Sequence, residues 1–210
     1  MKLQISFDIP DLQNALAKAK LVEPFCDTME IGTILIYRYG LQAIEEFKKQ
    51  FPSKVILADS KILDRGTLNA GIFAQAKADW ITVMAGTSKS VIHATCTTAH
   101  NAGLKVMLDL LDAEAEGQSA LEAKNLGVDA LILHSPHDEK DELLFLEDWE
   151  LVSGNTDLPI FISAKIKREN VDHIIALKPG GIVVGTSIVT AKDPAVEAEF
   201  YYKLVKGTKE

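Results

Sequence analysis

The densest group of chemically useful side chains lies in the segment VILADSKILDRG, where Asp59, Lys61 and Asp64 follow an apolar run. Side chains two apart on a β-strand point to the same side, so we expect Asp59 and Lys61 to face one way. A lysine between two carboxylates stays protonated and supplies a fixed positive charge for a developing enolate or carboxylate. A solvated surface trio has the same composition, so the spacing alone leaves both interpretations open.

Other ionisable residues also stand where apolar runs end. Asp8, Glu30 and Asp109 close three further runs, and His134 closes a fourth. Clustered carboxylates repel one another and require a cation, and Mg²⁺ is commonly held by one or two carboxylates. A histidine has an ordinary pKa near neutrality and can carry a proton in either direction. A packed histidine at a strand end is the alternative interpretation of His134.

These residues need elements that bring the ends of several runs together. Short apolar runs alternate with stretches of helical spacing, of which 11–22, 40–50, 91–102 and 119–126 are examples. Near-continuous apolar strands are typical of a parallel sheet that is buried on both faces. Eight strand-then-helix units predict an α/β fold, a closed (β/α)₈ TIM barrel formed by a single domain over residues 1–210. The eight runs are 3–9, 28–32, 54–58, 80–85, 105–110, 130–134, 159–163 and 181–185.

An open, doubly wound sheet is the alternative architecture. A dinucleotide-binding sheet needs the motif G-x-G-x-x-G after its first strand, whereas DIPDLQ follows Phe7 here. The closed barrel is therefore favoured. In a barrel the carboxyl ends of the strands surround the active site, which is where the acidic residues and His134 are expected to lie.

Composition limits the classes of partner. The chain has 22 basic and 30 acidic residues, a net charge of −8 and a sequence pI of about 5.2. This balance repels polyphosphate, so neither nucleic acid nor an anionic membrane is expected as a partner. Two cysteines cannot form a disulfide framework, and no apolar run approaches the length of a membrane span. We expect a soluble, cytoplasmic protein.

The motifs together resemble a known superfamily. The D-x-K-x-x-D spacing closes the third run, MEIGT (residues 29–33) lies on the second, and V-V-G-x-x-I followed by D-P lies near the end. With MKLQ at the start, these motifs resemble the orotidine-5′-phosphate decarboxylase superfamily. The nearest branch is that of 3-hexulose-6-phosphate synthase and 3-keto-L-gulonate-6-phosphate decarboxylase. The resemblance spans residues 3–206.

This resemblance implies a Mg²⁺-dependent lyase that acts on a ketose phosphate through an enediolate. In the synthase, the enediolate forms by deprotonation of ribulose 5-phosphate and adds to formaldehyde. In the decarboxylase, it forms by loss of CO₂ and is then protonated. The branch also implies a homodimer with sites at the subunit interface. The orotidine enzyme itself is disfavoured because it uses a lysine on the second strand, where this chain has Glu30.

The resemblance implies roles for residues that match the branch's motifs. Glu30 and Asp59 match the Mg²⁺ ligands, and Asp59 also faces the substrate. Asp8 and Lys61 match groups that position the metal and the substrate. His134 matches the acid/base histidine on the sixth strand.

The resemblance implies a separate role for each of three further residues. Asp64 matches a catalytic carboxylate that reaches into the neighbouring subunit's site. Asp109 matches the synthase, where the decarboxylase pattern has glutamate, and is expected to contact substrate. His137 stands where the decarboxylase has arginine, and it too is a candidate substrate contact.

The chain departs from the branch where the phosphate is expected. Ala164 and Lys165 replace a Gly-Gly pair whose backbone N–H groups approach the phosphate, and Thr186 after Gly185 replaces an arginine of the decarboxylase. Side chains at 164 and 165 block a close backbone approach, or Lys165 supplies a direct charge in its place. We predict that Lys165 contacts the phosphate, with the alternative that it points to water. The lost glycines also leave open a second class of function, a sugar-phosphate-binding barrel that does no catalysis.

Overall fold

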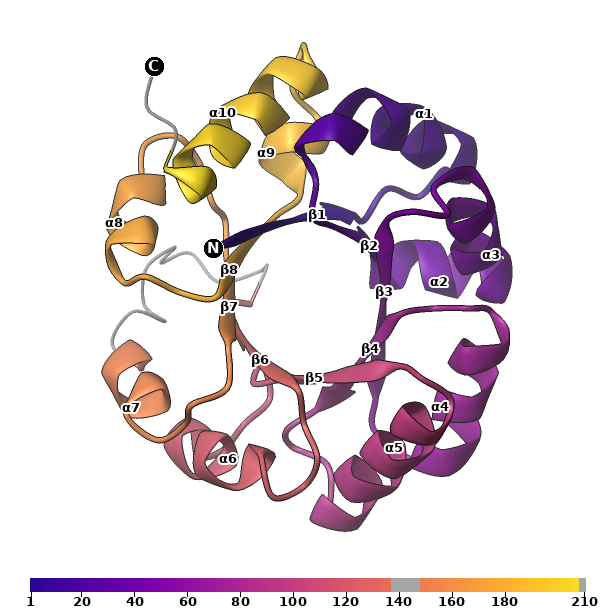
Figure 1. Cartoon of the computed structure of the whole chain (residues 1–210), viewed down its shortest axis with the longest axis vertical. Coiled ribbons are helices and arrows are strands. Elements are labelled where there is room, and N and C mark those ends of the chain that lie inside the picture. Colours follow the sequence, from indigo (N-terminus) through magenta and orange to yellow (C-terminus); the bar gives the residue numbers. More distant parts are fainter. Residues whose placement is uncertain (137–147, 208–210) are drawn as a thin grey trace.

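The strands form a closed parallel barrel. A computed structural model describes residues 1–136 and 148–207, and in it each strand pairs with its sequence neighbours while β1 also pairs with β8 (Figure 1). This closure confirms the predicted (β/α)₈ architecture and excludes the open sheet. The strands are β1 (Lys2–Phe7), β2 (Thr28–Ile31), β3 (Val55–Ile62), β4 (Trp80–Met84), β5 (Lys105–Asp109), β6 (Ala130–His134), β7 (Ile160–Ser163) and β8 (Gly181–Val184).

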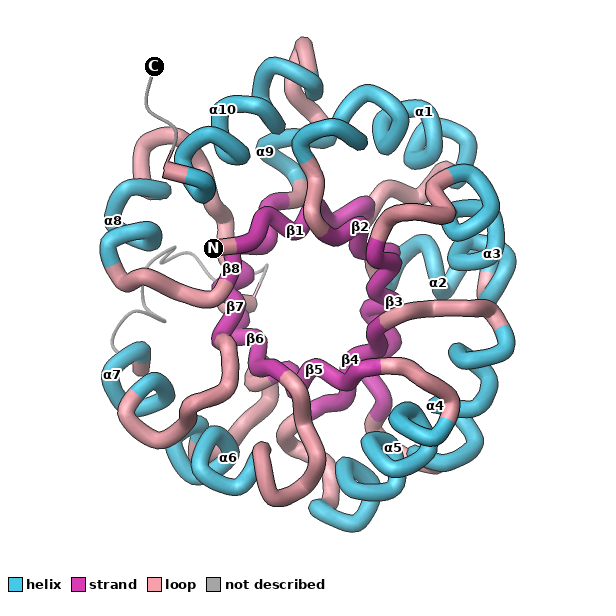
Figure 2. Tube along the Cα trace, in the orientation of Figure 1, coloured by secondary structure: helices cyan, strands magenta, loops and turns pink. Residues whose placement is uncertain are grey.

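Helices surround the strands as an outer ring (Figure 2). Side-chain caps fix several helix starts: Asp11 accepts a hydrogen bond from the Asn14 N–H, Ser88 from Val91, and Asp193 from Ala195 and Val196. The helices are α1 (Leu12–Val22), α2 (Thr33–Tyr39), α3 (Leu41–Gln50), α4 (Gly66–Gln75), α5 (Lys89–Asn101), α6 (Glu116–Ala123), α7 (Trp149–Ser153), α8 (Val171–Ala176), α9 (Thr186–Val189) and α10 (Pro194–Lys206), with a 3₁₀ turn at Glu23–Phe25. None of the helices in the described ranges is long and apolar enough to span a membrane.

Alternation along the strands divides the apolar side chains into two cores. On β3, Ile56 belongs to the large core between strands and helices, and Leu57 belongs to a smaller cluster with Met107 and Phe161. The barrel interior is therefore filled by side chains. The polar groups of the site lie beyond this smaller cluster, at the carboxyl ends of the strands.

The amino-terminal ends of three strand pairs share one device, which we call the aspartate clasp. Asp27, Asp79 and Asp129 each stand directly before an even-numbered strand. In each clasp the aspartate N–H donates to a carbonyl on the preceding strand, and the aspartate carboxylate accepts that same residue's N–H. The carboxylate bonds are Leu3 N–Asp27 Oδ2 at 2.8 Å, Ile56 N–Asp79 Oδ2 at 2.7 Å and Val106 N–Asp129 Oδ2 at 2.8 Å.

The fourth strand pair, β7–β8, has Gly180 at the equivalent position. Its N–H donates to the Ile160 carbonyl at 2.8 Å, as in the clasps, but it has no carboxylate to complete the second bond. A Cβ atom at Gly180 would lie 2.9 Å from the Pro159 Cβ, so the local packing has no room for an aspartate there. The strand pairs β1–β2, β3–β4 and β5–β6 therefore each have an aspartate clasp, and the pair β7–β8 has none.

Candidate active site

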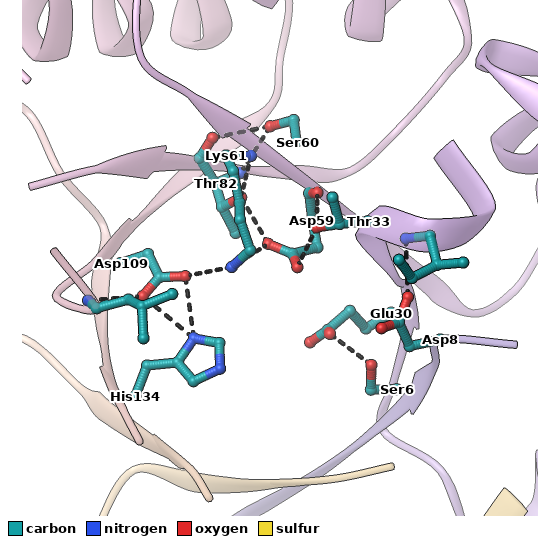
Figure 3. A network of polar contacts seen from close by, with 12 residues as sticks. Ser6, Asp8, Glu30, Thr33, Asp59, Ser60, Lys61, Thr82, Asp109 and His134 are labelled. Atoms are coloured by element: carbon teal, nitrogen blue, oxygen red, sulfur yellow. Dashed lines mark hydrogen bonds and ion pairs between the residues drawn. The ribbon is translucent and has the colours of Figure 1, made fainter. Parts of the chain in front are cut away.

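Ionisable side chains from four strands meet at the carboxyl-terminal rim of the barrel (Figure 3). Glu30 comes from β2, Asp59 and Lys61 come from β3, Asp109 ends β5, and His134 ends β6. Closing a parallel sheet brings these strand ends to one opening, which is the usual active-site face of this architecture.

Asp109 lies at the centre of the network and is fully buried. Its Oδ2 atom lies 2.7 Å from the Lys61 Nζ and 3.1 Å from the His134 Nδ1, and its Oδ1 accepts the Leu111 N–H at 3.0 Å. Burial alone would raise the pKa of this carboxyl. The hydrogen bond and charge of His134, together with the charge of Lys61, outweigh burial and lower the pKa to about 2. Asp109 is therefore an anion at neutral pH.

The orientation of His134 follows from this contact. Its Nδ1 faces the Asp109 carboxylate, an acceptor, so Nδ1 carries the hydrogen and Nε2 is left to exchange a proton. In Figure 3 the second ring nitrogen points away from Asp109. Burial works to lower the histidine pKa, but the hydrogen bond and charge of Asp109 prevail and raise it. The contact with Asp109 therefore fixes the neutral imidazole in the tautomer whose Nε2 carries no hydrogen.

Lys61 lies between two carboxylates, as predicted, but one of them differs from the expected pair. Its Nζ atom is 3.3 Å from Asp59 Oδ1 and 2.7 Å from Asp109 Oδ2. Burial disfavours the ammonium, yet the two carboxylates outweigh it and raise the lysine pKa. The sequence spacing suggested Asp64 as the second carboxylate, and within one chain this was wrong. Asp64 is exposed, and its carboxylate accepts the backbone N–H of Arg65 at 2.7 Å.

A backbone irregularity aims Lys61 at its partners. The β3–β4 register shifts between Ala58 and Ile62, and Lys61 has a φ of 43°, in the left-handed region that non-glycine residues rarely adopt. Its N–H donates to Thr82 Oγ1 at 2.8 Å, which holds the bulge against β4. Backbone conformations of this kind persist where the surroundings over-determine them, and they concentrate at functional sites.

Glu30 and Asp59 are the two carboxylates expected to hold a metal, and the charge of Asp59 acts on Glu30. Glu30 is 7% exposed, and its burial, followed by the charge of Asp59, raises its pKa to about 7. A divalent cation would relieve this repulsion, and Mg²⁺ characteristically takes one or two carboxylates and fills its remaining positions with water and substrate oxygens. Within residues 1–136 and 148–207 there is no group of three or more His, Cys, Asp or Glu suited to a metal. The two carboxylates fit Mg²⁺ in this open mode of binding.

The E-I-G-T motif connects β2 to the rest of the rim. The Asp8 carboxylate accepts the Ile34 N–H at 2.8 Å, and a Cβ at Gly32 would lie 2.4 Å from Asp8 Oδ1. Only glycine permits this approach. The Thr33 hydroxyl donates to Asp59 Oδ2 at 2.7 Å. The motif therefore positions Asp8 and Asp59 as well as supplying Glu30.

The residues expected at the phosphate lie at the ends of β7 and β8. Ala164 is half-buried and packs against the outer core, and Lys165 is half-buried beside it. A Cβ at Gly185 would lie 3.4 Å from the Ser6 Cβ, and Thr186 begins α9 at the surface. Their contact with a phosphate stays a prediction. The remaining candidate, His137, lies outside the described residues.

Sequence reasoning missed four neutral polar residues that contact the charged groups. Gln4 and Ser6 on β1 donate to Glu30, and Thr82 on β4 donates to Asp59 Oδ1 at 3.0 Å. Thr33 was noted only as part of a motif. The available signal was position: Gln4 and Ser6 lie two apart on one strand, and Thr82 interrupts the apolar run WITVM.

A closed parallel barrel with a lysine, a histidine and several carboxylates on its carboxyl rim defines an enzyme of the (β/α)₈ class. A profile described as the orotidine 5′-phosphate decarboxylase / HUMPS family matches residues 1–201. The chain belongs to this family, which confirms the resemblance, and it is a lyase of that superfamily.

Similar proteins cover nearly the whole chain. A 3-hexulose-6-phosphate synthase of Bacillus subtilis is 30% identical over 207 residues, covering 98% of this chain and 99% of that protein. The synthase of Mycobacterium gastri is 32% identical over 202 residues, covering 95% and 97%. A crystal structure of a 3-hexulose-6-phosphate synthase has a TM-score of 0.90 at 30% identity and covers 98% of this chain and all of that one.

Proposed function

We propose that this protein is a 3-hexulose-6-phosphate synthase, which joins ribulose 5-phosphate to formaldehyde in an aldol reaction. One observation carries the proposal: the buried Asp109 anion contacts both Lys61 and His134, and in the described part of the chain His134 Nε2 keeps no hydrogen-bond partner. A barrel that only binds a sugar phosphate has no use for a base prepared in this way. The similarity to curated synthases over the full chain supports the same reaction.

The proton steps belong to His134. Its Nε2 removes a proton from the carbon beside the ketone of ribulose 5-phosphate, and the C–H electron pair becomes the enediolate. That carbon attacks the carbonyl carbon of formaldehyde and forms the new C–C bond. The oxygen of formaldehyde then takes the proton back from His134. Asp109 stabilises the imidazolium between the two transfers, because its carboxylate lies against Nδ1.

The developing negative charge needs fixed positive charge beside it. Lys61 supplies an ammonium that its two carboxylates keep protonated and hold in place. Glu30 and Asp59 would hold the Mg²⁺ ion, which when bound supplies a second positive charge for the enediolate oxygens. Asp8 and His137 are proposed contacts of the sugar.

We also propose a homodimer in which Asp64 reaches the site of the partner. Four large apolar side chains are exposed on α2, on α4 and in the connection that holds Asp64: Ile34 and Tyr37 on α2, Leu63 directly before Asp64, and Leu68 on α4. Tyr37 is 79% exposed and Leu63 is 58% exposed. Burying such a surface against a second copy would stabilise the pair, and it would place Asp64 in an interface.

Two parallel assays test the proposed reaction, one with ribulose 5-phosphate plus formaldehyde and one with 3-keto-L-gulonate 6-phosphate. We expect turnover in the first, with loss of activity in excess EDTA and recovery when Mg²⁺ is returned. Turnover only of the gulonate phosphate would assign the decarboxylase instead. Binding of a sugar phosphate without turnover of either substrate would favour the non-catalytic barrel, and full activity in EDTA would contradict the metal assignment.

A further inference from the structure

Glu30 is held differently from Asp59 and Asp109. Asp59 and Asp109 both lie within ion-pair distance of Lys61. In the described part of the chain, Glu30 has no ion pair of this kind. Its two oxygens are instead each matched to one neutral donor.

Both donors come from strand β1. The Ser6 hydroxyl donates to Glu30 Oε1 at 2.6 Å, and the Gln4 amide donates to Glu30 Oε2. Gln4 and Ser6 lie on the same face of β1, and the parallel register sets Ser6 opposite Glu30 and Gln4 opposite Thr28. The strand pairing itself therefore delivers one donor to each oxygen, and Figure 3 shows Ser6 beneath Glu30.

The orientation of the Gln4 amide indicates that its hydrogen bond to Glu30 takes precedence over a partner for its own oxygen. Gln4 is fully buried, and its Oε1 atom has no hydrogen-bond partner among the described residues. Rotating the amide would place that oxygen against the Glu30 carboxylate, where two acceptors would face each other. The side chain keeps its donor on Glu30 at the expense of a buried acceptor, which is a costly arrangement unless the Glu30 contact matters.

We propose that Ser6 and Gln4 are positioning residues that fix both oxygens of Glu30 in the geometry required to bind Mg²⁺. The inference rests on the proposed role of Glu30 as a metal ligand. Each donor uses one lone pair of a carboxylate oxygen and leaves another lone pair for the ion. Outer groups that hydrogen-bond a ligating carboxylate orient it before the metal arrives, and their removal characteristically weakens metal binding.

The test measures metal binding directly, without substrate. Isothermal titration with Mg²⁺ alone would compare the wild-type protein with Ser6→Ala, Ser6→Cys and Gln4→Met. Cysteine keeps nearly the volume of serine and is a weak donor, and methionine keeps the length of glutamine without an amide. We expect the dissociation constant of Mg²⁺ to rise by about 10- to 100-fold in each variant. Ser90→Ala is the matched control because it removes an exposed hydroxyl on α5 whose hydrogen bond is to Ser88 and not to Glu30.

Two further readouts separate positioning from general damage. The Mg²⁺ concentration for half-maximal activity should rise in Ser6→Ala by a larger factor than kcat falls at saturating Mg²⁺. A purely structural defect would lower the melting temperature and kcat while leaving Mg²⁺ affinity unchanged, and it would overturn the inference. If Ser6→Ala does not fold, the Mg²⁺ affinity, melting temperature and kcat of Ser6→Cys test the inference in its place.

Glu30→Gln distinguishes the two levels of the proposal. If Glu30→Gln loses Mg²⁺ affinity and the Ser6 and Gln4 variants keep it, the positioning role is wrong while the metal role of Glu30 stands. If Glu30→Gln binds Mg²⁺ like the wild type, the metal assignment fails and the positioning role fails with it. Weakened binding in all of these variants, with Ser90→Ala unchanged, supports both.

Discussion

At the scale of single residues, Asp109 combines two functions that are usually separate. The same oxygen atom lies within hydrogen-bond distance of the Lys61 ammonium and of the His134 ring. It keeps the lysine protonated and in place, and it sets the tautomer of the histidine. The proposed acid/base group and the proposed fixed positive charge of the site therefore both contact one buried anion.

Replacing that anion gives a direct prediction. In Asp109→Asn the hydrogen bond and negative charge that raise the His134 pKa are lost. Burial and the charge of Lys61 continue to lower that pKa, and only the smaller effect of the Asp59 charge still raises it. We expect the His134 pKa to fall below the ordinary histidine value, as followed by NMR titration of the imidazole. We also expect kcat to fall by about 100-fold or more, the usual size of a general acid–base contribution. An unchanged titration would show that Asp109 does not control His134.

A second prediction concerns Lys165, which stands where the family resemblance implies a glycine whose backbone approaches the phosphate. Lys165→Ala should raise the KM for the phosphorylated sugar by about tenfold or more, as expected for loss of a charged hydrogen bond. Steady-state kinetics with ribulose 5-phosphate measure this change. Lys178→Ala is the control, because Lys178 lies between α8 and β8 at the opposite end of the barrel. An unchanged KM in Lys165→Ala would mean that this lysine is ordinary surface.

The sequence shows charged groups of this site more readily than neutral ones. Asp59, Asp109 and His134 each interrupt or end an apolar run, so their place on the rim could be predicted. Ser6 and Thr82 could not be assigned a role from the sequence. A hydroxyl within a strand can hydrogen-bond to many different groups, and its partner here lies on another strand. Their contribution depends on strand register, which the chain alone does not specify.

At the scale of elements, the eight strands were predictable because buried parallel strands are apolar on both faces. The helices α1 and α3 followed from their apolar spacing, and α3 was expected at 40–50 and begins at Leu41. The bulge in β3 was not predictable. The positive φ of Lys61 is held by Thr82 of the next strand, so it is a property of the pair β3–β4 and not of the segment that contains the lysine.

The β2–α2 connection provides a prediction at this scale. Gly32→Ala would place a Cβ 2.4 Å from Asp8 Oδ1 and 2.7 Å from the Asp8 Cα, so the end of β1 must shift. We expect a loss of about 1–3 kcal/mol of unfolding free energy, as is usual for overpacking. The melting temperature should fall by roughly 2–4 °C per kcal/mol, with reduced activity because Asp8 moves.

The control for this substitution is Gly71→Ala in α4. A Cβ at Gly71 meets nothing within 4 Å, and alanine is favoured over glycine inside a helix by about 0.5–1 kcal/mol. Gly71→Ala should therefore be neutral or slightly stabilising in the same thermal melt. Equal melting temperatures for the two variants would contradict the close approach of Gly32 and Asp8.

At the scale of the whole molecule, the proposed dimer can be tested by mixing two inactive chains. Asp64→Ala and Lys61→Ala should each be inactive as homodimers. After subunit exchange, a mixed dimer has one site with both residues intact, and an equal mixture should recover about a quarter of wild-type activity. Exchange is verified with differently tagged chains. Absence of recovery after proven exchange would show that Asp64 acts within its own chain or not at all.

The aspartate clasps have a consequence for which strands of the barrel open locally. Local openings of a folded chain expose amides to solvent in cooperative units of unequal stability. The clasped pairs β1–β2, β3–β4 and β5–β6 carry Glu30, Asp59, Lys61, Asp109 and His134, whereas the unclasped pair β7–β8 carries the residues expected to hold the phosphate. Native-state hydrogen exchange should therefore release β7 and β8 first, while the amides of the three clasped pairs stay protected. The pair β7–β8, where the phosphate is expected to bind, would then open and reclose while the strands that carry Glu30, Asp59, Lys61, Asp109 and His134 keep their register.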